Sequence, residues 1–259
     1  MSHGHSLPGV SSTTPPPRPT SLTERRKAET RREIARAAAG LFVRHGLRAT
    51  RAEDIAQAAG IAPRTFYRYF ATKEEAVAPL YATGAERWVE AVRAAPSDAG
   101  VLRALEEGVR HTLTPGFSVS ASSWEWVRTL LRLAEATPSL CRVWAEVCRA
   151  SERRLGEVLA ERVARAGAPA VTTAVFEADG GAVGGAVVVA PGGDDNVAVA
   201  GEPPALTPEL RFAAAVASAA VRAALEAWAA GDGPVDGPDG PAELALRNLA
   251  ALRDFPWGR

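Results

Sequence analysis

Histidine and cysteine are scarce in this chain, and their scarcity argues against most catalytic and metal-binding chemistry. The 259 residues contain four histidines and two cysteines, too few for a disulfide framework or a Cys/His metal site. We find no nucleophile–base–acid arrangement, and the glycine-rich run at 180–185 lacks the Gly-Lys-Ser/Thr that completes a phosphate-binding loop. We therefore predict that the protein is not an enzyme and has no catalytic residues, no metal site and no cofactor.

Long apolar runs are also lacking. No apolar run reaches the roughly 20 residues that a membrane-spanning helix needs, and the N-terminus is expected to have no apolar signal-peptide core. Apolar residues nevertheless make up 47% of the chain, which is enough to bury a core, and alanine, a strong helix former, dominates them. We expect an all-α, cytoplasmic protein with no membrane partner.

Neither sign of charge prevails over the whole chain, because 30 Lys and Arg residues balance 30 Asp and Glu residues. The distribution is uneven. Residues 22–75 carry 12 basic and 7 acidic residues, a net charge of +5, whereas residues 76–259 carry 17 basic and 23 acidic residues, a net charge of −6; Arg18 supplies the remaining positive charge. This asymmetry predicts that the N-terminal region alone meets phosphate.

Composition divides the chain into a tail and two domains. Residues 1–20 are rich in Ser, Thr and Pro and are expected to be disordered. Residues 21–75 form a small helical domain, and residues 76–259 form a larger one. Within the larger domain, residues 167–205 interrupt the helical pattern with Gly, Pro and Val. They form either short strands of a β-hairpin or, in the interpretation we prefer, an inserted flexible linker.

Two short helices with a tight turn are predicted within residues 50–73. Thr50 with Glu53 is typical of a capping box for a helix over 52–59. Gly60 ends that helix, because glycine enters a left-handed turn without a Cβ clash. Pro63 suits the first turn of the next helix, over 63–70, where its missing N–H has no partner anyway. The spacing indicates a helix–turn–helix.

The second of these helices carries side chains suited to DNA. Arg64 can donate two hydrogen bonds to a guanine edge, and Thr65 can bond a base or contact a thymine methyl group. Tyr and Arg side chains hold phosphate oxygens. The alternative is an ordinary helical hairpin with a solvated aromatic and basic face. Exposed aromatic side chains without a partner are unusual, which favours DNA binding.

Residues 30–75, TRREIARAAAGLFVRHGLRATRAEDIAQAAGIAPRTFYRYFATKEE, resemble the DNA-binding domain of the TetR family of transcriptional regulators. The resemblance implies a three-helix helix–turn–helix domain followed by a larger helical domain for ligand binding and dimerisation. It also implies a homodimeric repressor that a small-molecule effector releases from a palindromic double-stranded operator. The C-terminal half is faintly similar to regulators that bind acyl-CoA or lipophilic metabolites. Ala62 departs from the family pattern, which commonly has a Ser or Thr helix cap there.

The family motif assigns roles residue by residue. Arg64 and Thr65 would read base edges. Phosphates would be held by Tyr67, Arg68, Tyr69, Lys73 and Thr50. Arg51 is added only because it is expected to be exposed at a helix start. The full set of predicted DNA-binding residues is Thr50, Arg51, Arg64, Thr65, Tyr67, Arg68, Tyr69 and Lys73. The charged N-terminal half of the first helix, over 22–45, is either a solvated helix end or a further contact to the DNA backbone.

The larger domain is predicted to contain helices over 73–95, 98–113, 120–136, 138–165, 207–230 and 241–252. A ligand pocket is expected among them, with Trp88, His111, Trp124, Trp126 and Trp144 as candidate lining residues, although each Trp also suits a packed core. Pro79 is predicted to kink the 73–95 helix where a ligand signal has to pass. The helices over 138–165 and 207–230 are expected to form an intersubunit four-helix bundle.

Cys141 and Cys148 lie seven residues apart on one predicted helix. Helical geometry separates their Cα atoms by about 10 Å, which is too far for a disulfide. They are therefore predicted to be small core residues rather than a redox pair.

A second hypothesis for the whole chain is a ligand-independent or activating DNA-binding protein whose C-terminal domain only dimerises. A pocket in that domain would separate the two hypotheses.

Overall fold

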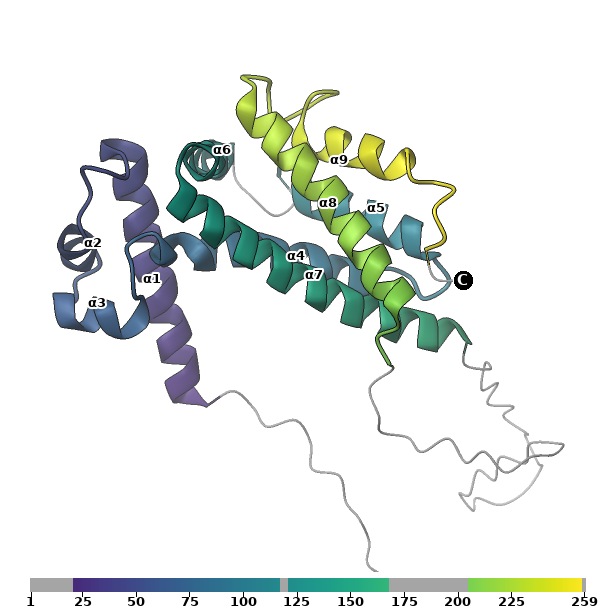
Figure 1. Ribbon diagram of the computed structural model, residues 1–259, viewed down its shortest axis with the longest axis horizontal. Coiled ribbons are helices and arrows are strands. Elements are labelled where there is room, and N and C mark those ends of the chain that lie inside the picture. The colour runs from purple at the N-terminus through teal and green to yellow at the C-terminus, as the bar shows by residue number, and fades with distance from the viewer. Residues whose placement is uncertain (1–20, 117–120, 168–204, 258–259) are drawn as a thin grey trace, which may run out of the picture.

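The computed structural model describes residues 21–116, 121–167 and 205–257, and within them every regular element is a helix (Figure 1). The all-α prediction is confirmed. The elements are α1 (Leu22–His45), α2 (Ala52–Ala58), α3 (Pro63–Tyr69), the 3-10 turn η1 (Glu75–Val77), α4 (Ala78–Ala94), α5 (Val101–Leu113), α6 (Ala121–Ala136), α7 (Pro138–Gly167), α8 (Pro208–Ala230) and α9 (Pro241–Ala250). The predicted tail at 1–20 and almost all of the predicted linker at 167–205 lie outside the described residues, so those predictions stay untested.

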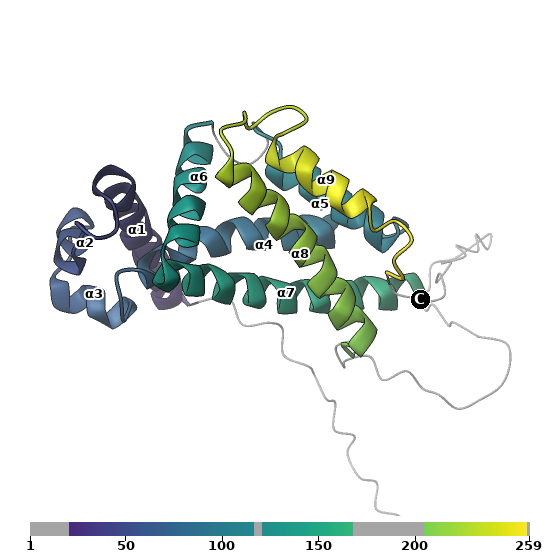
Figure 2. The same cartoon turned by 45° about the horizontal axis from the view of Figure 1, so that its top comes forward.

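The helices form two groups (Figure 1). Helices α1 to α3 make a small N-terminal unit at one end, and α4 to α9 make a larger unit. Helix α4 follows η1 and packs against α5 and α7, while α8 packs against α7 and α9. Figure 2 shows α6 standing between α1 and the rest of the larger unit, and α6 packs on α1, α7 and α8. The two units therefore meet through α4 and α6.

A shared apolar core fixes the N-terminal unit. Ile34 and Phe42 of α1, Ile55 of α2 and Phe66 of α3 are almost completely buried, which matches the apolar spacing of each helix. Gly60, the predicted stop of α2, has a positive φ angle of 67°, and Gly46, which follows α1, has a positive φ angle of 79°. The N-terminal turns of α1 are exposed on all sides.

The predicted capping box at the start of α2 is wrong by one residue. The cap is Arg51, whose backbone N–H donates to the Asp54 carboxylate at 2.8 Å. Thr50 instead turns its hydroxyl back toward α1 and donates to the carbonyl oxygen of Gly46 at 2.9 Å. Thr50 is only 2% exposed, so it closes the turn between the helices.

The predicted kink at Pro79 is also wrong. The sequence pattern indicated one helix from Lys73, but the 3-10 turn η1 comes first and α4 begins at Ala78. Pro79 therefore lies in the first turn of α4, where a missing N–H removes no intrahelical bond. Thr72 supports this new start, since its hydroxyl accepts the Glu75 N–H at 3.3 Å.

Helix α8 is more apolar than the sequence analysis expected. Within the described residues it is the one helix whose length and mean hydropathy, 1.3 over its most apolar window, would suffice to cross a membrane. The expectation that no segment reaches this length is wrong by that measure. The core helix of a folded domain meets the same criterion, and Leu210, Ala217 and Trp228 of α8 are buried in this core.

Arginine side chains hold two helix C-termini in the larger unit. Arg162 of α7 is buried and donates to the carbonyl oxygens of Ala95 at 2.8 Å and Pro96 at 2.7 Å, beyond the end of α4. Arg132 of α6 donates to the carbonyl oxygen of Ala229 at 2.6 Å, at the end of α8. A cation suits these positions because the last carbonyls of a helix carry partial negative charge.

Candidate DNA interface and ligand cavity

The outward face of α3 is the candidate DNA interface. Arg64, Tyr67 and Arg68 are exposed and share one face by their spacing of three and four residues. Thr65 and Tyr69 are half-buried on the neighbouring face. Tyr67, with 53% of its surface exposed, is one of the few large aromatic or apolar side chains left in solvent. The face therefore offers two guanidinium groups and a phenol to a ligand outside the fold.

The opposite face of α3 anchors the helix. Phe66 is fully buried, and its ring lies 5.9 Å from that of Phe70. Helix α3 begins at the Ala62 cap, which makes no side-chain cap bond, as the departure from the family pattern predicted. Seven residues without such a cap do not form a stable helix alone, so tertiary packing must hold α3 in place.

Arg31 of α1 supplies part of that packing and was missed by the sequence analysis. Its guanidinium donates to the carbonyl oxygen of Tyr69 at 3.1 Å and lies 4.6 Å from the centre of the Phe70 ring. It thereby holds the C-terminal end of α3 against α1. The sequence does contain a signal for this contact, because Arg31 lies one turn before buried Ile34 and therefore on the inward side of α1.

Lys73 and Thr50 are placed differently from the prediction. The Lys73 ammonium donates to the carbonyl oxygens of Leu47 at 2.7 Å and Thr50 at 2.8 Å. It ties the start of η1 to the turn between α1 and α2, and two of its three protons are used inside the fold. The hydroxyl of Thr50 is buried and internally bonded, so Thr50 does not fit the predicted phosphate contact. Arg51 is exposed beside α2, as expected.

The larger unit has a partly open cavity of about 160 Å³ between α4, α5, α6, α7 and α8. Its wall is mostly apolar and aromatic, with Tyr81, Leu113, Val127, Leu131 and Leu225 among the lining residues. Three predicted lining residues, Trp88, Trp124 and Trp144, are brought together in this wall. Small-molecule sites in proteins have this character.

The other two predicted lining residues lie elsewhere. His111 is exposed on the outer side of α5, although its neighbours Thr112 and Leu113 line the cavity. Trp126 is 39% exposed on α6. A Cβ atom added to Gly40 of α1 would come within 3.4 Å of the Trp126 ring, so Trp126 packs on α1 of the N-terminal unit. The prediction that His111 and Trp126 line the pocket is wrong.

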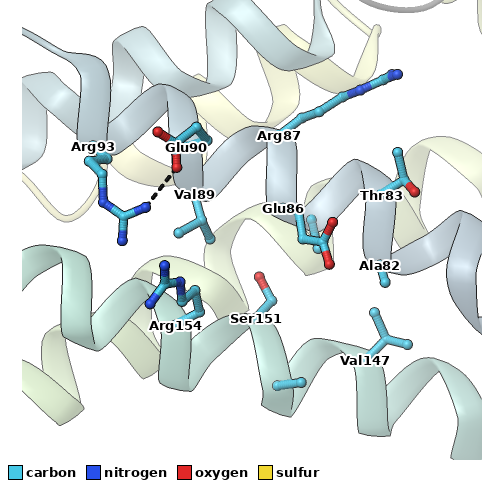
Figure 3. Close-up of a pocket in the computed structure, with 12 residues that line it drawn as sticks. Ala82, Thr83, Glu86, Arg87, Val89, Glu90, Arg93, Val147, Ser151 and Arg154 are labelled. Atoms are coloured by element: carbon cyan, nitrogen blue, oxygen red, sulfur yellow. Dashed lines mark hydrogen bonds and ion pairs between the residues drawn. The ribbon is translucent and has the colours of Figure 1, made fainter. Parts of the chain in front are cut away.

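A surface groove borders the cavity. The groove has a volume of about 630 Å³ between α4 and α7, and it shares Ala85, Arg87, Val147 and Ser151 with the cavity wall. Figure 3 shows Glu86 and Arg93 of α4 across the groove from Ser151 and Arg154 of α7. Arg93 pairs there with Glu90 at 2.7 Å. The shared residues show that the groove and the cavity adjoin.

Three polar atoms on residues that line the cavity are buried away from its open space and have no hydrogen-bond partner among the described residues. They are the indole nitrogens of Trp88 and Trp124 and the hydroxyl oxygen of Ser218. The indole nitrogen of Trp144 differs, because it donates to the Glu226 carboxylate at 2.8 Å. A buried polar group without a partner costs about 1–3 kcal/mol of stability.

Burial shifts two ionisable side chains of the cavity lining toward their neutral forms. Burial raises the pKa of the Cys148 thiol to about 12, although the nearby Arg222 guanidinium acts in the opposite direction. Burial likewise raises the pKa of Tyr81, whose hydroxyl donates to the carbonyl oxygen of Leu130 at 2.9 Å. Cys148 is thus a neutral wall residue, whereas Cys141 is exposed. The prediction that both cysteines are core residues is wrong for Cys141.

The geometry defines a class of protein: a helix–turn–helix DNA-binding unit joined to a separate helical unit that contains a cavity. Comparisons with known proteins narrow this class to one family. The sequence profile of bacterial regulatory proteins of the tetR family matches residues 34–78. The HTH-type transcriptional regulator TcmR of Streptomyces glaucescens is 34% identical over 157 residues, which cover 58% of this chain and 68% of TcmR.

Two solved structures are similar over most of their length. One is a putative TetR-family regulator from Mesorhizobium loti, with 18% identity, a TM-score of 0.47, and coverage of 88% of this chain and 96% of that chain. The other is FadR of Thermus thermophilus, a TetR-family repressor in complex with lauroyl-CoA, with 20% identity, a TM-score of 0.48 and the same coverage. The TcmR relationship shows that this chain belongs to the TetR family of transcriptional regulators. It is a regulator and not an enzyme, as predicted.

Proposed function

We propose that this regulator is a homodimeric repressor that a small lipophilic molecule releases from a palindromic operator. The observation that carries the proposal is the apolar cavity of the larger unit, which lies apart from the exposed face of α3. A regulator whose second domain only dimerised would gain nothing from a buried cavity, since packing defects cost stability. The ligand-independent hypothesis is therefore the weaker one.

On the operator, α3 lies in the major groove. Arg64 is in the first turn of α3, the part of a recognition helix that reaches base edges. Arg68 and Tyr67, one turn further on, contact phosphates, and Arg51 joins them from the start of α2. Thr65 and Tyr69 are half-buried and take smaller parts, Thr65 at a base edge and Tyr69 at a phosphate.

Dimerisation uses the outward side of α8 together with α7. Phe212 is 61% exposed, and Ala219, Ala223 and Ala227 follow along the exposed side of α8 at intervals of four residues. Small residues at this spacing allow two helices to approach closely, and a twofold axis presents the same side of both copies. The length and apolar character of α8 suit burial of this second side in a dimer.

The signal passes from the cavity to the DNA-binding unit through α6. Trp124 of α6 lines the cavity, and Trp126, two residues on, packs against α1 at Gly40. The Tyr81 hydroxyl joins α4 to α6 through the carbonyl oxygen of Leu130. A ligand that moves α6 thus changes the position of α1 and, in a dimer, the spacing of the two α3 helices.

The first experiment selects operators from a randomised duplex library with the purified full-length protein and measures the mass of the free and DNA-bound forms. We expect a dimer and a consensus with two inverted half-sites, because half-site symmetry mirrors protein symmetry. A monomeric protein, or a consensus with one half-site only, contradicts the proposal.

The second experiment tests the route through α6. A compound that lowers operator affinity is first found by screening, and its effect is then measured with Trp126→Ala. We expect Trp126→Ala to bind the compound as the wild type does and to release DNA less readily. Glu135→Ala, at another exposed position of α6, is the control. If both variants release DNA like the wild type, the signal does not pass through the Trp126 contact.

A further inference from the structure

We propose that an arginine clamp, made by Arg128 and Arg132 of α6 with residues 228–233, sets the spacing between the two operator half-sites that the protein accepts. The inference rests on the homodimer and the palindromic operator of the proposed function. It assigns specificity for half-site spacing to two residues that lie outside the N-terminal unit. The argument starts from what holds α6, continues with what α6 carries, and ends with the use of α8 in a dimer.

Arg132 joins α6 to the C-terminal end of α8, which lies beside α6 (Figure 2). Its guanidinium donates to the carbonyl oxygens of Ala229 at 2.6 Å and Gly231 at 2.7 Å, and it pairs with the Asp232 carboxylate at 2.6 Å. The last carbonyl oxygens of a helix lack partners within the helix, and the planar guanidinium group binds several acceptors in a fixed geometry. Arg132 therefore fixes the position of α6 relative to the end of α8.

Arg128 makes the same connection one turn earlier on α6. It is buried, donates to the carbonyl oxygen of Gly233 and lies 4.3 Å from the centre of the Trp228 ring of α8. A guanidinium group over an aromatic ring is attracted by the ring face. Trp228 in turn packs edge to face on Trp124 of α6, with 5.4 Å between the ring centres. Polar and aromatic contacts thus attach the same two helices.

Another side of α6 supports the N-terminal unit. Trp126 is two residues before Arg128 and therefore about 200° around the helix from it, and it packs on α1 at Gly40. Arg31 of α1 holds the C-terminal end of α3. Helix α1 also contacts η1 and α4, so the N-terminal unit is attached at two places. The arginine clamp controls the place at α6, and with it the rotation of the N-terminal unit.

A dimer turns this rotation into a distance. In the dimer proposed above, α8 and α7 of both copies form the interface, so the two α8 helices are fixed relative to each other. Each α6 is attached to its α8 by the arginine clamp, and each α3 follows α6 through α1. The clamp therefore fixes where the two α3 helices lie relative to the twofold axis, and DNA half-sites have to match that separation.

The alternative is that the two arginines only cap α8 and stabilise the larger unit. Their loss would then weaken binding to all operators by the same factor. A spacing role predicts a different result, because a loosened clamp lets the dimer adapt to half-sites at other separations. The two roles therefore differ in relative affinities, whatever happens to stability.

The experiment changes the spacing between half-sites and keeps their sequence. Starting from the operator selected by the full-length protein, duplexes are made with the central spacer unchanged, one base pair shorter and one base pair longer. Each base pair moves a half-site by about 3.4 Å and turns it by about 36° around the DNA axis. Dissociation constants for the three duplexes are measured with the wild type and with each variant.

The variants are Arg132→Gln and Arg128→Gln, with Arg103→Gln as the matched control. Arg103 is an exposed arginine whose partner, Glu107, lies in the same helix at 3.1 Å, so its loss disconnects no two helices. Thermal unfolding shows which variants fold. Arg132 is exposed, so Arg132→Gln keeps the test decisive if the buried substitution Arg128→Gln prevents folding.

The measured quantity is the ratio of the dissociation constant for a changed spacer to that for the selected spacer. We expect a ratio clearly above one for the wild type and for Arg103→Gln. For Arg132→Gln we expect a ratio about twofold to tenfold lower, because a shifted half-site no longer has to break a hydrogen bond of the clamp. Base preference within each half-site should stay unchanged, since the outward face of α3 is intact.

Equal ratios in the wild type and Arg132→Gln overturn the inference, as does a wild type that accepts all three spacers equally. Weaker binding to every duplex with an unchanged ratio also overturns it, because the arginines then only stabilise the fold. A monomer or a single half-site overturns the proposed function and this inference with it. Two inverted half-sites with unaltered spacing selectivity in the variants overturn this inference alone.

Discussion

The two units of this regulator differ in how closely their interiors are packed. In the N-terminal unit the core side chains Ile34, Phe42, Ile55 and Phe66 are fully or almost fully buried. Among the described residues, every buried side-chain nitrogen or oxygen without a hydrogen-bond partner belongs to the larger unit. The larger unit also contains the cavity.

The difference follows from the two tasks. Reading base edges requires side chains held within a fraction of an ångström, so the unit that carries α3 leaves no slack. Under the proposed function, the larger unit has to leave space for a ligand. The comparison predicts that equal substitutions have unequal effects in the two units.

The largest effect is expected for Phe66→Ala. Truncation of a fully buried Phe costs about 3–5 kcal/mol of unfolding free energy, because the closely packed neighbours of Phe66 cannot fill the space that it leaves. Urea unfolding measures the loss. Tyr67→Ala, at the exposed neighbouring position, is the control and should keep its stability while binding DNA less tightly. A cost for Phe66→Ala below about 1 kcal/mol would mean that the unit is not closely packed.

Arg64→Ala should weaken operator binding by about 1–3 kcal/mol and relax base preference at one position per half-site, because a bidentate contact to guanine discriminates by this amount. Binding to an operator library at several salt concentrations measures both effects. Arg68→Ala is the matched control, since loss of a phosphate contact should weaken all sequences alike and reduce the salt dependence. Full base preference in Arg64→Ala would show that another residue reads that position.

Lys73→Met should weaken DNA binding and should also lower the free energy of unfolding by about 1–2 kcal/mol. The ammonium donates to two backbone carbonyls, and charge-assisted hydrogen bonds of this kind stabilise more than neutral ones. Thermal unfolding measures the effect, and Lys27→Met, at an exposed lysine of α1, is the control. If the stability of Lys73→Met is unchanged, the two internal hydrogen bonds of Lys73 do not stabilise the fold, and its predicted phosphate contact is the one role left.

The smallest effect is expected in the larger unit and has the opposite sign. Ser218→Ala removes a buried hydroxyl that lacks a partner and should raise the unfolding free energy by up to about 1 kcal/mol. Ala217→Ser, next to it and fully buried in the core, is the control and should destabilise. A destabilised Ser218→Ala variant would show that the hydroxyl has a partner after all, and the contrast between the units would weaken.

Much of this fold could be predicted from the sequence, because its signals are local. Helix ends at Gly46 and Gly60, the start at Pro63 and the inward face of each helix depend on residues within one or two turns. The outward face of α3 follows from the same spacing. For these features, local propensity and tertiary packing agree.

The errors concern side chains whose partners are distant in sequence. Lys73 meets the carbonyl of Leu47, 26 residues earlier, and no local pattern indicates that contact. The errors over Trp126 and His111 were avoidable. Trp124 shares its helix face with Val127 and Leu131, both in the cavity wall, and a residue two positions on points elsewhere. Likewise, Val109, Thr112 and Leu113 define the buried face of α5, from which His111 is turned away.

The division of α3 into an anchoring side and a free side has an evolutionary consequence. Phe66 and Phe70 hold the helix, while Arg64, Tyr67 and Arg68 project from it without taking part in the core. Under the proposed function, substitutions at these three positions would change which promoter the protein binds and would leave the core intact. Gene duplicates can thus keep one chemical signal and acquire different target genes by changes confined to a single turn of helix.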